Sequence, residues 1–460
     1  MPLMTGILTP KPELAKDRQL FDHRALKAMI LPLFLEQVLQ LAVGLADTLM
    51  VSYAGEETVS GVSLDAMLYT VFIFLFSAIA TGGAVVVSQY LGSRDSRKAG
   101  LAASQIFLIA GVVSFACMAL ILPGSTGLLA FLYPKVEPGV MRASVIYLRI
   151  AALSFPANAL YNAGAALYRS MGKTRVTLFV SILMNLLNAA GNAVGIFVFH
   201  AGAAGVAWPT TVSWWFAAVL MTRLCLKPGK QVTVRLRDML RIDPDMDRRI
   251  LRMAVPNAVE NTLFQLAKVV LGTLVATFGT AQIAANGIGQ TIWSFAGCMS
   301  MTMSPVFITV IGQCIGKGDA EAADWYMRRL IRLTIILCAS WNALVLAFVP
   351  LILPLYRVSE EAKHLIWVIV IIHNIIAVGA HPFYWPLSSG LRAAGDARFA
   401  MWTSFFSTVV CRTFFSYLLG LWLGMGVIGI TLAMCIDWII KSILDIGRWH
   451  SGKWKAFRVI

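Results

Sequence analysis

Long apolar stretches separated by short polar loops occupy almost the whole chain. A helix advances about 1.5 Å per residue, so about 20 apolar residues are enough to cross a membrane. Twelve stretches have this length, and we therefore predict an all-α polytopic membrane protein with twelve transmembrane helices. The predicted helices cover residues 28–52, 59–90, 99–122, 141–168, 176–199, 203–226, 250–278, 283–315, 329–353, 364–391, 399–422 and 425–446.

The composition supports a membrane protein and excludes a nucleic-acid partner. Hydrophobic residues make up 58% of the chain and charged residues 13%, whereas soluble domains carry about 25% charge. The net charge is +15, but the cations gather in every second connection, most densely at 227–249. The positive-inside rule then predicts a multi-pass protein of the plasma (bacterial inner) membrane with both termini cytoplasmic. Its expected environment is the lipid bilayer.

The second half of the chain repeats polar and glycine positions of the first half. Pro32, Glu36, Gly55, Gln89, Gly92 and Asp95 recur 224 residues later as Pro256, Glu260, Gly279, Gln313, Gly316 and Asp319. Further on, RSMGKTR at 169–175 matches RAAGDAR at 392–398. A six-helix repeat enters the membrane from the same side twice, which predicts two six-helix bundles related by a pseudo-twofold axis along the membrane normal. We expect an N-lobe at 1–230 with helices 1–6, and a C-lobe at 231–460 with helices 7–12. The basic segment 227–249 would link them.

Two carboxylates lie inside the first predicted helix, where lipid disfavours charge. Glu36 and Asp47 are eleven residues apart, so their directions differ by only about 20°, and Gln40 lies on the same face. An ionisable group inside a span commonly faces a substrate or ion pathway. The alternative is that both acids lie at the headgroup level. The face predicts a polar surface on which a cation can be bound.

Other polar side chains within the predicted helices extend this candidate site. Glu260 in helix 7 follows Pro256 by one turn. The remaining candidates are Asn188 and Asn192 in helix 5, Asn257 and Asn261 in helix 7, Asn286 and Gln290 in helix 8, and His381 in helix 10. Amides can also simply hold helices together, and that alternative stays open. Arg149 and Arg412 are predicted to pair with acids or backbone carbonyls.

Motifs of enzymes and ATP-driven pumps are missing from the sequence. It has no Walker loop, no dinucleotide fingerprint, no Ser-His-Asp spacing and no zinc-protease motif. The seven cysteines form no Cys-x-x-Cys pair. We therefore predict a protein that is not an enzyme and that has no cofactor beyond a coupling ion, H⁺ or Na⁺.

Several motifs resemble those of the multidrug and toxic compound extrusion (MATE) family over essentially the whole chain. They are LADTLMVSYAG closing helix 1, the Pro256 to Glu260 element, NLLNAAGN in helix 5 and LRAAGDAR after helix 10. The resemblance implies a V-shaped pair of bundles that exports cationic amphiphiles in exchange for sodium ions or protons. It also implies that Asp47, Asn188 and Asn192 form a cation site and that Glu260 is the C-lobe acid. Where the sodium-coupled branch often has an acid in helix 10, this chain has His381.

The resulting functional hypothesis is a monomeric secondary antiporter that exports organic cations and drugs. Its alternatives are a flippase of lipid-linked saccharides, which would need several cationic residues in the cavity, and a major-facilitator-type carrier. Oxygen ligands from Asp47, Asn188 and Asn192 would suit sodium. Glu260 has amide neighbours but no second acid, and Lys268 could pair with it or face another element. Burial disfavours the charged form of a lone carboxylate. We therefore expect proton exchange at Glu260 and a sodium effect at Asp47.

Overall fold

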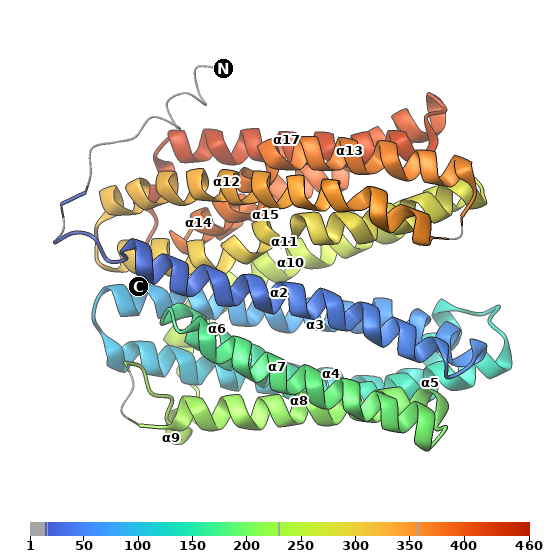
Figure 1. Ribbon diagram of the computed structural model, residues 1–460. Helices are drawn as coiled ribbons and strands as arrows, with labels where there is room; N and C mark the ends of the chain where they lie inside the picture. Colours follow the sequence, from blue (N-terminus) through green and yellow to red (C-terminus); the bar gives the residue numbers. More distant parts are fainter. Residues whose placement is uncertain (1–13, 16, 229–230, 357) are drawn as a thin grey trace. The chain divides into compact units, whose positions relative to one another are not determined.

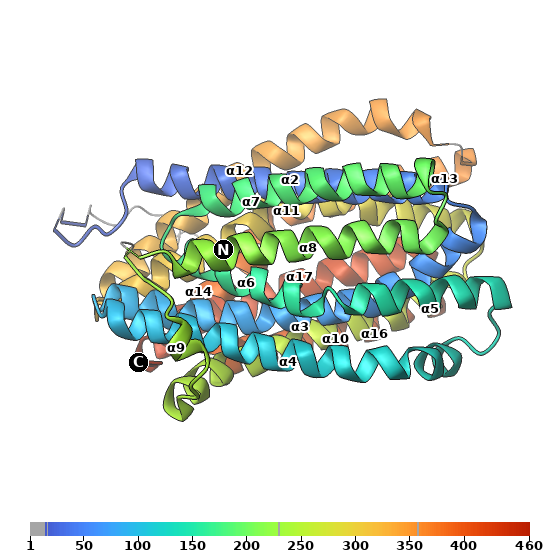
Figure 2. The same cartoon turned by 90° about the horizontal axis from the view of Figure 1, so that it is seen from below.

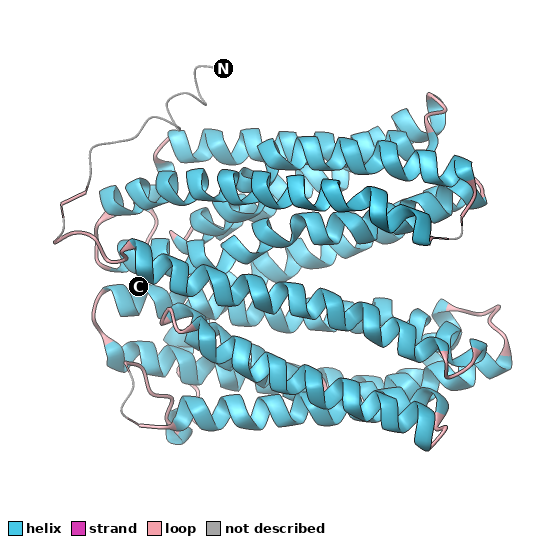
Figure 3. Cartoon of the chain, viewed as in Figure 1, coloured by secondary structure: helices cyan, strands magenta, loops and turns pink. Residues whose placement is uncertain are grey.

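The computed structural model describes residues 14–15, 17–228, 231–356 and 358–460. Within these ranges all regular secondary structure is helical, as Figure 3 shows, and no strand is present. The chain divides into two compact units, Leu31–Ala258 and Met1–Ile30 with Val259–Ile460. We call them the N-terminal unit and the C-terminal unit. The all-α polytopic fold predicted from the sequence is confirmed, and the predicted domain boundary at residue 230 stays a prediction.

The N-terminal unit is built mainly from the first six predicted spans (Figures 1 and 2). Its helices are α2 (His23–Ser52), which begins in the other unit, α3 (Glu56–Gly92), α4 (Ser96–Leu132), α5 (Pro138–Ala152), α6 (Phe155–Ser170), α7 (Thr174–Ala193), η1 (Val194–Val198), α8 (Gly202–Leu226) and α9 (Leu236–Met239). Together α5 and α6 form the predicted span 141–168, and they are bent by 45° at their junction. Because α6 packs against α3, α4 and α8, it forms the centre of this unit.

The C-terminal unit contains the last six predicted spans. Its helices are α10 (Pro244–Ala276), which begins in the other unit, α11 (Thr280–Gly316), α12 (Ala320–Ile352), η2 (Leu353–Leu355), α13 (Glu360–Pro382), η3 (Phe383–Leu387), α14 (Ser388–Ala393), α15 (Ala397–Ser404), η4 (Phe405–Cys411), α16 (Arg412–Phe415), η5 (Ser416–Trp422), α17 (Gly426–His450) and η6 (Lys453–Ala456). Spans 10 and 11 are interrupted by π-helical turns, one of which follows Pro382 directly. Wide turns of this kind often mark functional segments.

Ten helices in the described part of the chain are long and apolar enough to cross a membrane, and the bent pair α5–α6 makes an eleventh. The remaining predicted span corresponds to α8. With 25 residues α8 also has the required length, but its glycine, serine and threonine residues make it less apolar.

The repeat seen in the sequence recurs as repeated local geometry. Gly55 and Gly279 precede α3 and α11 with φ of 99° and 96°, a backbone conformation that side chains with a Cβ rarely adopt. Asp95 and Asp319 precede α4 and α12, and each side chain accepts a hydrogen bond from the backbone N–H three residues later. The same residue types therefore form the same turns and helix caps in both halves.

Two segments outside the spans, around Arg18 and around residues 238–241, pack against the helix ends that are predicted to be cytoplasmic. Arg18 binds Asp319 through two hydrogen bonds of 2.6 and 2.8 Å. In the predicted linker, the backbone oxygens of Asp238 and Arg241 accept hydrogen bonds of 2.8 and 2.7 Å from Gln105. Each segment is thus held by specific side chains of its own unit.

Candidate functional site

Asp47 in α2 lies against two amides of α7. Asn192 donates from Nδ2 to Asp47 Oδ1 over 3.0 Å. The Asn188 amide is 3.1 and 3.2 Å from the two carboxylate oxygens when its nitrogen faces Asp47, and its oxygen then accepts from Thr210. Both asparagines are buried, and Asp47 is half-buried. The structure therefore brings together the three residues that the sequence predicted for a cation site.

Glu36, the other acid of α2, has different surroundings. Its Oε1 accepts a hydrogen bond of 2.7 Å from Arg169, and the Thr177 hydroxyl lies 2.9 Å from its Oε2. The Glu36 side chain is only 1% exposed. Its negative charge is thus compensated within the N-terminal unit by a cation at the end of α6.

Glu260 in α10 is held by the equivalent arginine and by a lysine. Its Oε1 lies 3.4 Å from Arg392, 3.1 Å from Lys441 and 2.6 Å from the Ser404 hydroxyl. Arg169 and Arg392 are the first residues of the two matching segments 169–175 and 392–398. The expectation of a lone buried carboxylate at Glu260 is therefore wrong, and its lysine partner is Lys441. A buried carboxylate needs a compensating cation, and in both repeats an arginine of another helix provides it.

The remaining predicted residues are dispersed. Gln40 is exposed on α2, Asn257 is buried in the N-terminal unit, and Asn261 and Asn286 are half-buried in the C-terminal unit. Gln290 contacts the Met434 sulfur over 4.0 Å. His381 is buried, with its ring centroid 4.4 Å from that of Trp438. Gln40 and Asn257 belong to the same unit as Asp47, whereas the other four belong to the C-terminal unit.

The prediction for Arg149 is wrong, and Arg412 interacts with the acid Asp437 electrostatically but makes its hydrogen bond elsewhere. Arg149 donates to the hydroxyls of Ser125 and Thr126 over 2.9 and 3.2 Å. Arg412 donates from Nη2 to the Met434 sulfur over 3.0 Å. Hydroxyl and thioether groups are neutral acceptors, so neither guanidinium is compensated by an acid at hydrogen-bonding distance in the described part of the chain.

Sequence reasoning missed four buried charged residues inside the predicted spans. Asp437, Lys441 and Asp445 follow one another at four-residue spacing on α17, and all three are buried. That spacing places them on one helix face, and it is visible in the sequence of the last span. Asp65 in α3 is also fully buried, and its Oδ1 accepts a hydrogen bond of 2.8 Å from Ser144. A search for isolated acids in apolar stretches would have found Asp65.

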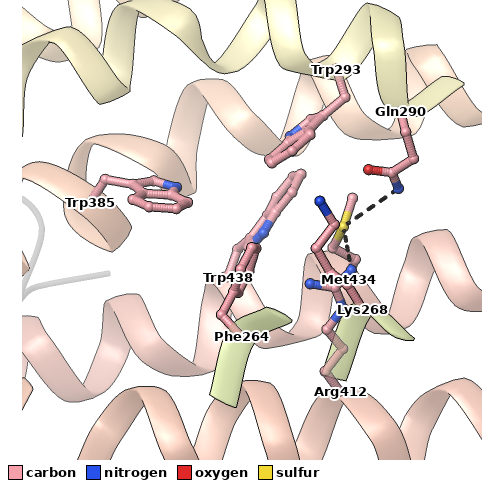
Figure 4. A pocket seen from close by; sticks show the side chains of 8 residues that line it. All are labelled: Phe264, Lys268, Gln290, Trp293, Trp385, Arg412, Met434 and Trp438. Carbon is pink, nitrogen blue, oxygen red and sulfur yellow. Dashed lines mark hydrogen bonds between the residues drawn. The ribbon is translucent and has the colours of Figure 1, made fainter. Parts of the chain in front are cut away.

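A small cavity lies in the C-terminal unit, with about 10 Å³ open to water-sized particles. Figure 4 shows the Lys268 and Arg412 side chains directed toward Met434, beside the indoles of Trp293 and Trp438. These two rings stack at 5.9 Å with an interplanar angle of 17°. The lining residues are Phe264, Lys268, Gln290, Trp293, Trp385, Arg412, Met434 and Trp438. Both charged residues of this cavity are cations.

The family model described as MatE matches residues 32–194 and again residues 256–418. The chain belongs to the MatE family. The two matches coincide with the repeat, and MatE proteins are membrane transporters rather than enzymes. The chain is accordingly a multi-pass membrane protein of a multidrug efflux family, and a major-facilitator carrier is not supported.

Individual relatives agree with this MatE assignment over nearly their whole length. The "Uncharacterized transporter YisQ" of Bacillus subtilis (strain 168) is 28% identical, covering 92% of this chain and 93% of the relative. The "Probable multidrug resistance protein NorM" of Thermotoga maritima is 25% identical, with coverage of 98% and 96%. A solved structure described as "Outward-facing conformation of a multidrug resistance MATE family transporter of the MOP superfamily" has a TM-score of 0.87 at 18% identity, with coverage of 93% and 95%. This likeness shows that the fold is shared.

Proposed function

We propose that the protein is a secondary antiporter that exports organic cations in exchange for protons or sodium ions. The observation that carries this proposal is the environment of Asp47. Its hydrogen bonds come from neutral amides, and none of the ion pairs among the described residues includes it. A carboxylate inside a membrane protein with only neutral partners favours the uptake of a proton or a cation.

Competition for this carboxylate provides the coupling. A proton, a sodium ion and the cationic group of a substrate each neutralise the same negative charge, so binding of one disfavours binding of another. An ion gradient can then drive export because the bound species differ on the two sides of the membrane. Asp47 is half-buried, so a ligand can reach it more readily than it can reach Asp65, which is fully buried.

The surroundings of Glu36 and Glu260 favour a different role for these acids. Each is already neutralised by an arginine of its own unit, at 2.7 and 3.4 Å. We therefore assign the coupling ion to Asp47, with Asn188 and Asn192 as its neighbours, and regard Glu36 and Glu260 as members of internal ion pairs. We further propose residence in the plasma (bacterial inner) membrane with cytoplasmic termini, and a monomeric transporter.

The test uses purified protein in lipid vesicles and a fluorescent lipophilic cation such as ethidium. An imposed ion gradient should drive ethidium uphill with the wild-type protein but not with Asp47→Asn. The matched control is Asp65→Asn, which removes a buried carboxylate of the same unit and should retain transport. Equal transport by Asp47→Asn and the wild type would refute the assignment. Translocation of a lipid-linked saccharide without ethidium transport would favour the flippase alternative instead.

The same vesicles separate the two coupling ions. Transport in sodium-free potassium buffer with a pH gradient alone would identify the proton. Transport that requires a sodium gradient and persists when a protonophore collapses the pH difference would identify sodium. In either case the dependence on the ion should disappear in Asp47→Asn, because that variant has no negative charge to neutralise at this position.

A further inference from the structure

The polar groups around the cavity of the C-terminal unit are predominantly hydrogen-bond donors. Lys268 comes from α10, Gln290 from α11 and Arg412 from α16 (Figure 4). An ammonium and a guanidinium have no acceptor atoms, and a guanidinium stays charged in proteins. Gln290 offers its amide nitrogen toward the Met434 sulfur at 4.0 Å. The cavity thus has the polarity expected for a negatively charged ligand.

Two of the lining side chains also carry buried N–H groups without a partner among the described residues. They are Arg412 Nε and Trp293 Nε1. Arg412 is 5% exposed and Trp293 is 7% exposed. The hydrogen bond that Arg412 does make goes to the sulfur of Met434, which is a weak acceptor. Buried donors in native proteins are normally satisfied, so these two groups indicate a missing acceptor.

The acids of the C-terminal unit do not supply that acceptor. Glu260 is bound to Arg392 and Lys441. Asp437 accepts from Thr408 over 3.2 Å and interacts with Arg412 electrostatically, without an ion pair between them within 4.0 Å. Asp445 lies 3.4 Å from the Thr403 hydroxyl. None of these acids therefore accepts a hydrogen bond from Arg412 in the described part of the chain, although the negative charge of Asp437 acts on it electrostatically.

We propose that this cavity binds a small monovalent anion, a halide, between Arg412 and Lys268. Only about 10 Å³ of the cavity is open to water-sized particles, so it suits a single small ion. This proposal uses only residues of the C-terminal unit and does not rest on antiport at Asp47.

The experiment measures equilibrium binding to the purified full-length protein without any ion gradient. Thermal unfolding is followed over a range of chloride, bromide or gluconate concentrations at equal ionic strength. We expect chloride and bromide to stabilise the wild-type protein relative to gluconate. In Arg412→Gln the apparent affinity for the anion should fall about tenfold to a hundredfold, as expected for loss of a hydrogen bond to a charged group.

Lys268→Gln is the second variant, because Lys268 is exposed and its replacement should not disturb folding. It should also weaken anion binding. Arg149→Gln removes an arginine of the other unit and should leave the binding unchanged. The proposal is overturned if neither chloride nor bromide stabilises the protein relative to gluconate, or if both variants retain wild-type affinity.

Discussion

The ion pairs of Glu36 and Glu260 allow a quantitative comparison between the two repeats. Replacing Arg169 by methionine would leave Glu36 buried with Thr177 as its hydrogen-bond partner at 2.9 Å. Removing one partner of a buried ion pair costs about 3–5 kcal/mol. Replacing Arg392 by methionine should cost less, about 1.5–3 kcal/mol, because Lys441 and Ser404 still bind Glu260 at 3.1 and 2.6 Å.

These free energies translate into measurable shifts of the melting temperature. A change of 1 kcal/mol shifts the midpoint by about 2–4 °C in a unit of this size. Arg169→Met should therefore lower the melting temperature by about 6–20 °C, and Arg392→Met by roughly half as much or less. The assay is differential scanning fluorimetry of the purified proteins in one detergent at one scan rate. Arg149→Met is the control, since its two partners are hydroxyls that water can replace.

A double variant tests the reasoning independently of the size of the shifts. In Glu36→Gln with Arg169→Met, the buried negative charge is removed together with its partner, so at least half of the lost stability should return. The reasoning is refuted if the double variant is as unstable as Arg169→Met. It is also refuted if Arg392→Met destabilises the protein as much as Arg169→Met does.

Three further predictions concern packing, pH and the linker. Gly195→Ala should destabilise the protein by about 1–3 kcal/mol in thermal unfolding, because an added Cβ would collide with the Gly205 backbone. Gly44→Ala should be neutral, because no atom lies within 4 Å of a Cβ added there. Hydrogen bonds from the Arg18 guanidinium hold the pKa of Asp319 below its usual value. The contact between Arg18 and Asp319 should therefore be complete above about pH 3.9 and should be lost as the pH falls through that lowered pKa. A spin label near Arg18 should then become mobile in acid, and a label that stays immobile would contradict this. Replacing Gln105 by alanine should increase amide exchange in the 231–243 segment, since its side chain binds two backbone oxygens there, and unchanged exchange would show that other contacts hold the linker.

The sequence by itself determined the membrane class, the positions of the spans and the repeat. These features depend on the length of apolar segments and on local turns, as at Gly55 and Gly279, where the backbone adopts a positive φ. It also identified Asp47, Asn188 and Asn192, because helical periodicity places an acid and two amides on polar faces of two helices. The resemblance to MATE proteins then singled out these residues together.

Only the tertiary structure decided which charges are compensated. Glu36 and Glu260 look like Asp47 in the sequence, since each is an acid in an apolar span. Arginines 133 and 132 residues away, Arg169 and Arg392, neutralise them. Arg412 shows the converse, because it had been expected to find an acid or a carbonyl and its hydrogen bond goes instead to the Met434 sulfur. Charge compensation acts across helices that are distant in the chain, so it depends on how the helices pack and not on the pattern within any one of them.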